Sequence, residues 1–157
     1  MIQRVQTIFL FLIVIGMGTC LLSTSWLERG QSGEQATLTA FQLQAQRAET
    51  VISSVPVYYI AILAVLAAGV AAYSALQYRN RLLQIKLGAL NSLLMAVLLA
   101  CIMYFSSQVG EALVNPAPQG QYATGFYAVI LALICNMLAN RFIRRDEQLV
   151  RSADRMR

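Results

Sequence analysis

The chain has 157 residues, of which 58% are hydrophobic and only 12% are charged, and its formal net charge is +5. Soluble domains average about 45 to 50% apolar and roughly 25% charged residues, so this composition excludes an ordinary soluble protein. The length leaves room for one domain, and we expect residues 1–157 to form a single integral membrane domain.

Four apolar stretches predict membrane-spanning helices, because a bilayer core about 30 Å thick needs roughly 17 to 25 apolar helical residues. Apart from Arg141 at the end of the last stretch, they contain no Asp, Glu, Lys or Arg, so no ion or proton pathway is predicted. The expected fold is all-α, an up-and-down transmembrane four-helix bundle with a short amphipathic helix outside the membrane. The predicted spans are residues 7–23, 55–78, 87–105 and 126–141.

The first apolar stretch also has features of a cleaved secretory signal. Arg4 supplies a positive N-terminal region, and the small residues Ser23 to Ser25 offer a cleavage point. The stretch is long for a signal peptide and just long enough for a span, which favours an uncleaved anchor. Both alternatives are compatible with these residues.

The segment between the first two spans predicts a short amphipathic helix. Its apolar residues alternate in spacings of three and four, with glutamine and charged residues on the other face. These apolar residues are Leu38, Phe41, Ala45, Ala48 and Ile52. Such a helix would lie on the outer membrane interface or cap the bundle, and docking onto a partner is the alternative.

Local signals also place the start of the second span and its connection to the third. Ser53 and Ser54 followed by Pro56 predict a helix start, since proline is tolerated in the first turn. The connection of residues 79–86 is so short that spans two and three must be antiparallel neighbours.

The basic residues predict the orientation. Positive residues in short flanking segments stay in the cytoplasm, so we expect both termini and the middle connection there. Ten of the twelve basic residues then lie on the cytoplasmic side, and only Arg29 and Arg47 lie outside. Aromatic residues at the span ends agree with this orientation. They are Trp26, Tyr58, Tyr59, Tyr104, Tyr122 and Tyr127 at the outer interface and Tyr78 and Phe142 at the inner one.

The three cysteines, Cys20, Cys101 and Cys135, all lie in apolar stretches, and the chain contains no histidine. Without the commonest metal ligands, we expect no metal and no cofactor. Free cysteines are commonly buried as small apolar residues. A disulfide between Cys20 and Cys101 is the alternative, because both lie near the outer ends of their spans.

Two asparagines, Asn91 and Asn136, lie within spans. An amide in hydrocarbon is costly unless it is hydrogen-bonded, so we expect these side chains to make polar contacts between helices. Contact with a substrate or a quinone headgroup is the alternative.

The C-terminal tail, residues 142–157, predicts a cytoplasmic continuation of the last helix, with Glu147 and Arg151 as a favourable pair four residues apart. Its basic residues and those of the middle connection are candidates for contact with anionic lipid, and an apolar stripe that includes Leu149 and Met156 for contact with a partner protein. The candidate contact residues are Arg79, Arg81, Lys86, Arg144, Arg145, Leu149 and Met156. Interleaved acidic residues and the lack of stacking aromatics argue against nucleic acid.

No catalytic motif is present, so we expect a non-enzymatic protein. A structural or accessory subunit of a membrane complex is the favoured interpretation, with a protein partner and the lipid bilayer as its contacts. The alternative is a small carrier or a lipid- or quinone-binding membrane protein.

Residues 1–7, 78–91 and 139–157 resemble the domain of unknown function 4293 family, which consists of small four-span bacterial membrane proteins. The resemblance extends over essentially the whole chain. It implies a bacterial inner (cytoplasmic) membrane location and an uncleaved first span, and it carries no activity, cofactor or site.

Overall fold

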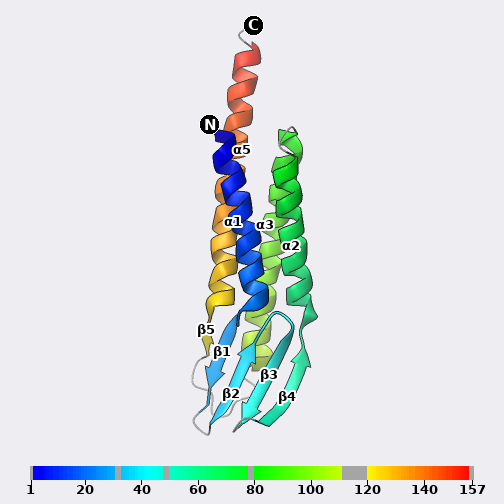
Figure 1. Cartoon of the computed structure of the whole chain (residues 1–157), viewed down its shortest axis with the longest axis vertical. Coiled ribbons are helices and arrows are strands. Elements are labelled where there is room, and N and C mark those ends of the chain that lie inside the picture. The colour runs from blue at the N-terminus through cyan, green and yellow to red at the C-terminus, as the bar shows by residue number, and fades with distance from the viewer. Residues whose placement is uncertain (1, 31–32, 48–49, 78–79, 111–119, 156–157) are drawn as a thin grey trace.

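The computed structural model describes residues 2–30, 33–47, 50–77, 80–110 and 120–155. Within this part of the chain, four long helices lie side by side and a five-stranded antiparallel sheet extends from one end of them (Figure 1). The helices are α1 (Ile2–Leu22), α2 (Tyr58–Leu76), α3 (Arg81–Tyr104) and α5 (Thr124–Arg155), and α3 continues into the π-helical turn η1 (Phe105–Gly110). The strands are β1 (Trp26–Arg29), β2 (Glu34–Leu38), β3 (Gln42–Arg47), β4 (Thr50–Pro56) and β5 (Gln121–Tyr122).

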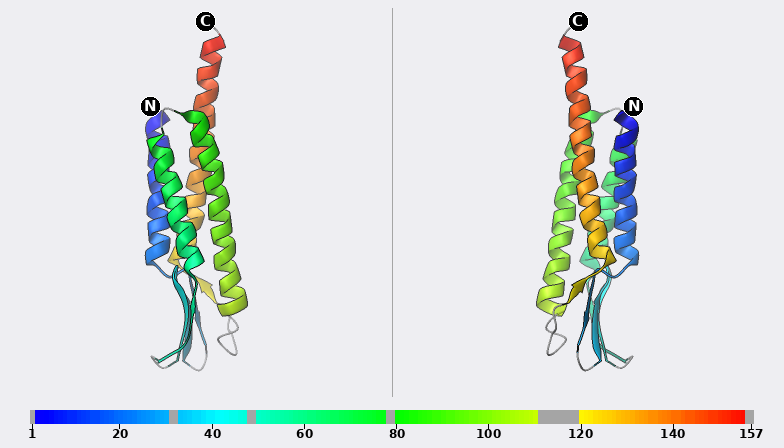
Figure 2. Two further views of the ribbon diagram at one scale, coloured as in Figure 1. Left: turned by 90° about the vertical axis from the view of Figure 1, so that its right-hand side faces the viewer. Right: turned by 90° about the vertical axis from the view of Figure 1, so that its left-hand side faces the viewer.

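Each helix packs against two neighbours. Helix α1 packs against α2 and α5, and α3 packs against the same two, so α1 and α3 lie diagonally across the group. As predicted, α2 and α3 are antiparallel neighbours. Both ends of the chain and the junction of α2 with α3 lie at one end of the helices, and the sheet lies at the other (Figure 2).

Small residues allow the helices to approach closely, which favours association in lipid. On α2 the buried face carries Ala64, Ala67 and Ala71. Between α1 and α5 the approach is closer still, because a Cβ added to Gly16 would lie 3.1 Å from the Cβ of Ala132. Alanine and glycine therefore occupy the closest contacts between the helices, and larger apolar residues such as Ile13, Met17 and Leu98 fill the rest of the interior.

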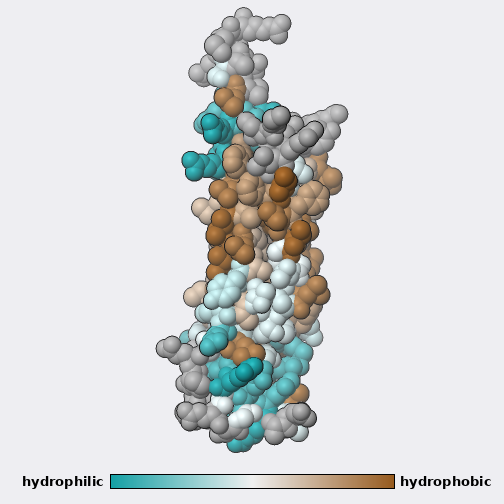
Figure 3. Space-filling model, turned by 60° about the vertical axis from the view of Figure 1, so that its left-hand side comes forward, coloured by the Kyte–Doolittle hydropathy of each residue, from teal (hydrophilic) through white to brown (hydrophobic). Residues whose placement is uncertain are grey.

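The outward faces of the helices are apolar. Three helical segments, Tyr58–Leu76, Arg81–Gly110 and Thr124–Leu149, are long and apolar enough to cross a membrane, which confirms the second, third and fourth predicted spans at this level. Helix α1 carries a shorter apolar stretch, Gln6–Leu22. On the face shown in Figure 3, hydrophobic residues cover the helices between a hydrophilic end and the largely hydrophilic sheet. These features indicate association with a membrane.

The all-α expectation is wrong, because the segment between α1 and α2 forms four strands of a sheet with the order β4-β3-β2-β1-β5. The predicted amphipathic helix over residues 38–52 is absent: its described residues belong to β2, β3, β4 and the turn between β2 and β3. Burial alternates with period two, as in a strand that faces a core on one side. The buried residues are Ala36, Leu38, Ala40, Leu43 and Ala45.

Turns and strand pairing, rather than the helical spacing of the apolar residues, decide the conformation of this segment. Gly33 has a φ of 76°, a left-handed conformation that glycine adopts without strain, next to the start of β2. Between β2 and β3, the Thr39 hydroxyl donates to the Gln42 carbonyl at 2.9 Å and accepts from the Gln42 amide at 3.2 Å. Glu34 and Arg47 are directly opposite in β2 and β3, and their side chains form an ion pair at 3.5 Å.

The sheet is attached to the start of α2 through the turn between β2 and β3. The amide of Val57 donates to the Phe41 carbonyl at 2.9 Å, and the amide of Ala61 donates to the Ala40 carbonyl at 3.1 Å. The first-turn amides of a helix have no partner within it, so these bonds cap α2 with backbone from the sheet. The predicted start of this span at residue 55 is wrong, because Pro56 ends β4 and the helix begins at Tyr58.

Trp26 is a core residue of the sheet rather than an aromatic at the lipid interface, since only 2% of its surface is exposed. Its indole lies against Gly110 at the end of η1 and against Gly120 next to β5. A Cβ added to Gly110 would lie 2.6 Å from the ring, and one added to Gly120 would overlap it. Trp26 therefore joins the sheet to the end of α3 across two glycines.

Candidate functional site

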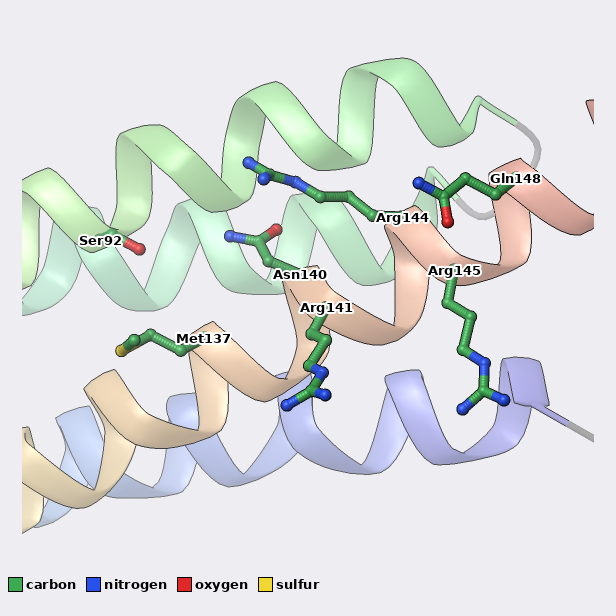
Figure 4. A pocket seen from close by; sticks show the side chains of 7 residues that line it. All are labelled: Ser92, Met137, Asn140, Arg141, Arg144, Arg145 and Gln148. Carbon is green, nitrogen blue, oxygen red and sulfur yellow. The ribbon is translucent and has the colours of Figure 1, made fainter.

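A mainly polar stripe along α5 lines a pocket at the end of the helices that carries both chain termini. Six residues of α5 at successive spacings of three, one, three, one and three share this stripe, and Ser92 of α3 completes the lining (Figure 4). The pocket encloses about 640 Å³. The α5 residues are Met137, Asn140, Arg141, Arg144, Arg145 and Gln148.

Amide and hydroxyl groups cluster at the end of the pocket that lies nearer the middle of the helices. The Nδ2 of Asn136 donates to the Gly88 carbonyl at 2.8 Å and to the Ser92 hydroxyl at 2.7 Å. Asn140 occupies the space that a side chain at residue 88 would fill, because a Cβ on Gly88 would overlap its amide. Among the described residues, the buried Oδ1 of Asn140 has no hydrogen-bond donor. This oxygen is buried against Gly88 and is not open to the pocket.

The end of the pocket nearer the chain termini is lined by basic residues. Arg144 and Asn140 point toward α3, whereas Arg141 and Arg145 point away from α3 on the opposite flank of α5 (Figure 4). Within the described part of the chain, none of the three arginines forms an ion pair, and the lining contains no acidic residue. Two acidic residues, Asp146 and Glu147, follow Arg145 on the same helix.

The acidic residue beside them, Asp146, is bound to Arg81 at the start of α3. One guanidinium nitrogen of Arg81 lies 3.2 Å from the Asp146 carboxylate, and another donates to the Asp146 carbonyl at 3.2 Å. This contact places the start of α3 beside the basic part of α5, so residues from both predicted basic segments lie at one end of the helices.

The other predicted contact residues are more scattered. Lys86 is exposed on α3 but does not line the pocket, and Leu149 is exposed on α5 beyond it. Arg79 and Met156 lie outside the described residues. Sequence reasoning missed Ser92, Asn140, Arg141 and Gln148 as members of one site. The helical spacing along α5 could have grouped Asn140, Arg141 and Gln148. Ser92 could be added only once it was known that α3 packs beside α5.

Asn91, the other predicted interhelical contact, is buried on α3 with 1% of its surface exposed. Neither polar atom of its amide has a hydrogen-bond partner among the described residues. Nearby, the Nε2 of Gln84 donates to the Ser74 carbonyl at 2.8 Å and ties the start of α3 to the end of α2.

The three cysteines are free thiols. Cys20 is on α1 and Cys101 is on α3, and these helices lie diagonally across the group. The suggested disulfide between them is not formed.

A second exposed surface lies on the sheet. Strand β4 is at the edge, with β3 as its described neighbour, and most of its side chains are exposed. Val51 and Ile52 expose 56% and 60% of their surfaces. Exposed apolar residues on an open edge are unusual, because such edges pair readily with other strands.

The sequence matches the family described as "Domain of unknown function (DUF4293)" over residues 2–156. The chain belongs to this family. No curated protein matches the sequence. The match agrees with the resemblance of residues 1–7, 78–91 and 139–157 to this family, and the family description states no activity.

Proposed function

We propose that this protein is a non-enzymatic accessory subunit of the bacterial inner membrane, which crosses the membrane four times and presents the edge of its outer sheet to a partner protein. The observation that carries the proposal is the open edge strand β4 with its exposed apolar residues Val51 and Ile52.

The outer surface of α1 supports a fourth span. Its apolar stretch, Gln6–Leu22, extends about 26 Å at 1.5 Å per residue, which is close to the shortest length that crosses a bilayer core. Phe11 and Ile15 expose 61% and 62% of their surfaces on the side away from the other helices. Large apolar side chains exposed in this way are stable in lipid and costly in water.

The ends of the chain support the proposed orientation. Both termini lie at the end of the helices that carries Arg81, Arg144 and Arg145, and the sheet lies at the opposite end. Basic flanking residues remain in the cytoplasm during insertion, so this end is cytoplasmic and the sheet is outside.

The partner that fits β4 is a strand of another polypeptide. The strands run roughly along the helix axes and therefore along the membrane normal (Figure 1). Two copies in one membrane are related by rotation about that normal, so their β4 strands point in the same direction. Antiparallel pairing of two β4 strands would invert one copy in the membrane, so a different chain is the better occupant for β-strand addition.

Photo-crosslinking in intact cells tests this proposal. A photoreactive phenylalanine analogue at Ile52 should yield one discrete crosslinked product, and the same analogue at the exposed Gln121 on the opposite edge strand should not. With the analogue at Ser54, the product should disappear when Ile52→Lys introduces a charge on the edge. The lack of a product at Ile52 and Ser54 in correctly folded protein would refute the proposal.

An apolar groove favours binding of a lipid tail or quinone as a second candidate function. It encloses about 390 Å³ between the sheet end of α1, the turn before β3, and α2. Its lining has no polar surface and includes Leu21, Phe41 and Val65. Filling the groove with Val65→Trp should reduce the amount of copurified lipid or quinone. An unchanged amount would contradict this second function.

A further inference from the structure

We infer, on the basis of the proposed function, that the strand that binds β4 belongs to a membrane-anchored protein. In that protein the strand begins directly after a membrane span, and it pairs antiparallel with β4 around Ser54. Three observations support this: the direction of the backbone groups of β4, two features that shorten its open edge, and the short distance from that edge to the start of α2.

Hydrogen bonding to β3 decides which backbone groups of β4 a partner can reach. Among the described strands, β4 pairs only with β3. The amide of Val57 donates to the Phe41 carbonyl at 2.9 Å, which makes these two residues a hydrogen-bonded pair. Such pairs alternate with non-hydrogen-bonded pairs along antiparallel strands, so the pair of Ser54 with Gln44, three positions earlier, is non-hydrogen-bonded. The amide and the carbonyl of Ser54 therefore face the open edge.

Two features confine pairing to the part of the edge around Ser54. Toward α2, the next outward-facing residue is Pro56, which has no amide proton to donate. In the other direction the register shifts between Ala45 and Gln46, and Ile52 is the extra residue of this bulge. Prolines and bulges on an edge prevent indiscriminate pairing. Strand β4 therefore accepts a short strand in one register, which favours a specific partner over a second edge of any kind.

The two faces of β4 predict the side chains of the partner. Val55 is half-buried and packs against the core, opposite the buried Leu43. A partner residue beside Val55 would extend this apolar face, and side chains approach most closely at such a non-hydrogen-bonded position. Ser54 is exposed on the polar face. The partner strand should therefore carry a polar residue opposite Ser54 and an apolar residue next to it.

The open edge lies close to the membrane. Strand β4 ends at Pro56 and α2 begins at Tyr58, whose side chain is 60% exposed at a position suited to the membrane interface. Ser54 is four positions before Tyr58, which places it within about 13 Å of the start of the helix at 3.3 Å per residue. A partner chain that leaves a span as a strand reaches this height in about four residues.

The direction of β4 decides from which side the partner chain arrives. Strand β4 leads into α2 and so runs toward the membrane (Figure 1). All described strand pairs of the sheet are antiparallel, and antiparallel pairing is the more stable per residue. An antiparallel partner runs away from the membrane, so its span precedes its strand. The chain itself has this arrangement, because β1 begins at Trp26, four positions after α1 ends at Leu22.

Photo-crosslinking in intact cells tests the role of the Ser54 amide. With the photoreactive analogue at Ile52, Ser54→Ala keeps the backbone amide and should leave the amount of crosslinked product unchanged. Ser54→Pro removes the amide that faces the open edge but no hydrogen bond to β3. It should lower the amount of product by about fivefold or more, because the partner carbonyl loses its donor. Circular dichroism and the emission of Trp26, the one tryptophan of the chain, verify that both variants are folded.

Mass spectrometry of the product formed without a change at Ser54 locates the crosslink in the partner. The linked residue should lie within about eight residues after a membrane span, given the height of Ile52 above α2. Attachment to a soluble protein, to a segment that precedes a span, or to a second copy of this chain would overturn the inference. An undiminished product in folded Ser54→Pro would do the same. Each of these results still leaves β4 in contact with a protein, whereas no product at Ile52 would refute the proposed function itself.

Discussion

Asn136 on α5 donates a 2.8 Å hydrogen bond to the backbone carbonyl of Gly88 on α3, across 48 positions of the sequence. The same amide nitrogen donates to the hydroxyl of Ser92, one turn further along α3. A polar amide within an apolar helix is thereby satisfied by its neighbour, and the contact sets the relative position of the two helices that line the pocket.

The variant Asn136→Leu should therefore destabilise the packing of α3 against α5. We expect a loss of about 1 to 2 kcal/mol in the free energy of unfolding, since polar contacts between spans contribute amounts of this order. Titration of the purified protein with a denaturing detergent, followed by circular dichroism, measures the change. Met137→Leu, at an exposed position next to it, is the control and should be close to neutral. Equal stability of the two variants would contradict this prediction.

Gly88→Ala adds only one methyl group but should clearly destabilise the packing of α3 against α5. The added Cβ would overlap the amide of Asn140, so that amide must leave its site or α3 must move away from α5. Overpacking of this kind costs about 1 to 3 kcal/mol. The control is Gly69→Ala on α2, where no atom lies within 4 Å of the added Cβ and the better helix propensity of alanine should stabilise the helix slightly. The same detergent titration compares them, and a neutral Gly88→Ala would contradict the close contact.

Gly120→Ala should disturb the junction between the sheet and α3. The added Cβ would overlap the indole of Trp26, which is 2% exposed, so the ring must move toward water. The fluorescence emission of this single tryptophan should then shift to longer wavelength. Gly18→Ala, which has open space around the added atom, should leave the emission unchanged. An unshifted spectrum in Gly120→Ala would show that the ring is not confined by this glycine.

The proposed orientation predicts which introduced cysteines a membrane-impermeant maleimide reaches in intact spheroplasts. In a background with Cys20, Cys101 and Cys135 replaced by alanine, Gln42→Cys on the sheet should label before lysis. Ser152→Cys near the end of α5 should label only after lysis. Both positions are exposed, so access depends on the side of the membrane. The reverse pattern would place the sheet in the cytoplasm and overturn the topology.

Much of the helical part was predictable from the sequence. The length and continuity of an apolar stretch are local properties, and they located the starts of α2 and α5 to within about three residues. Helix α3 begins at Arg81 rather than at residue 87, because the helix extends through most of the predicted connection of residues 79–86. The helical continuation of α5 beyond residue 141 was also predicted correctly, because helical charge spacing is visible along one segment.

The sheet was not predictable in the same way. Leu38, Phe41 and Ala45 have helical spacing, yet their conformation is decided by antiparallel partners, by the turn at Thr39 and by the attachment to α2. Strand pairing joins residues from different segments, so a local pattern of so few apolar residues cannot reveal it. Trp26 was misassigned to the lipid interface for the same reason.

The sequence by itself determined which segments are long and apolar enough to cross a membrane and which flanking segments carry the basic residues, since both are properties of single segments. Only the tertiary structure decided which of those residues meet. Asn140 and Arg144 form a pocket because Gly88 and Ser92 of α3 lie beside them, and no periodicity within α5 identifies its neighbour. Close packing between helices depends on side chains far apart in the chain, so the site exists only in the folded protein.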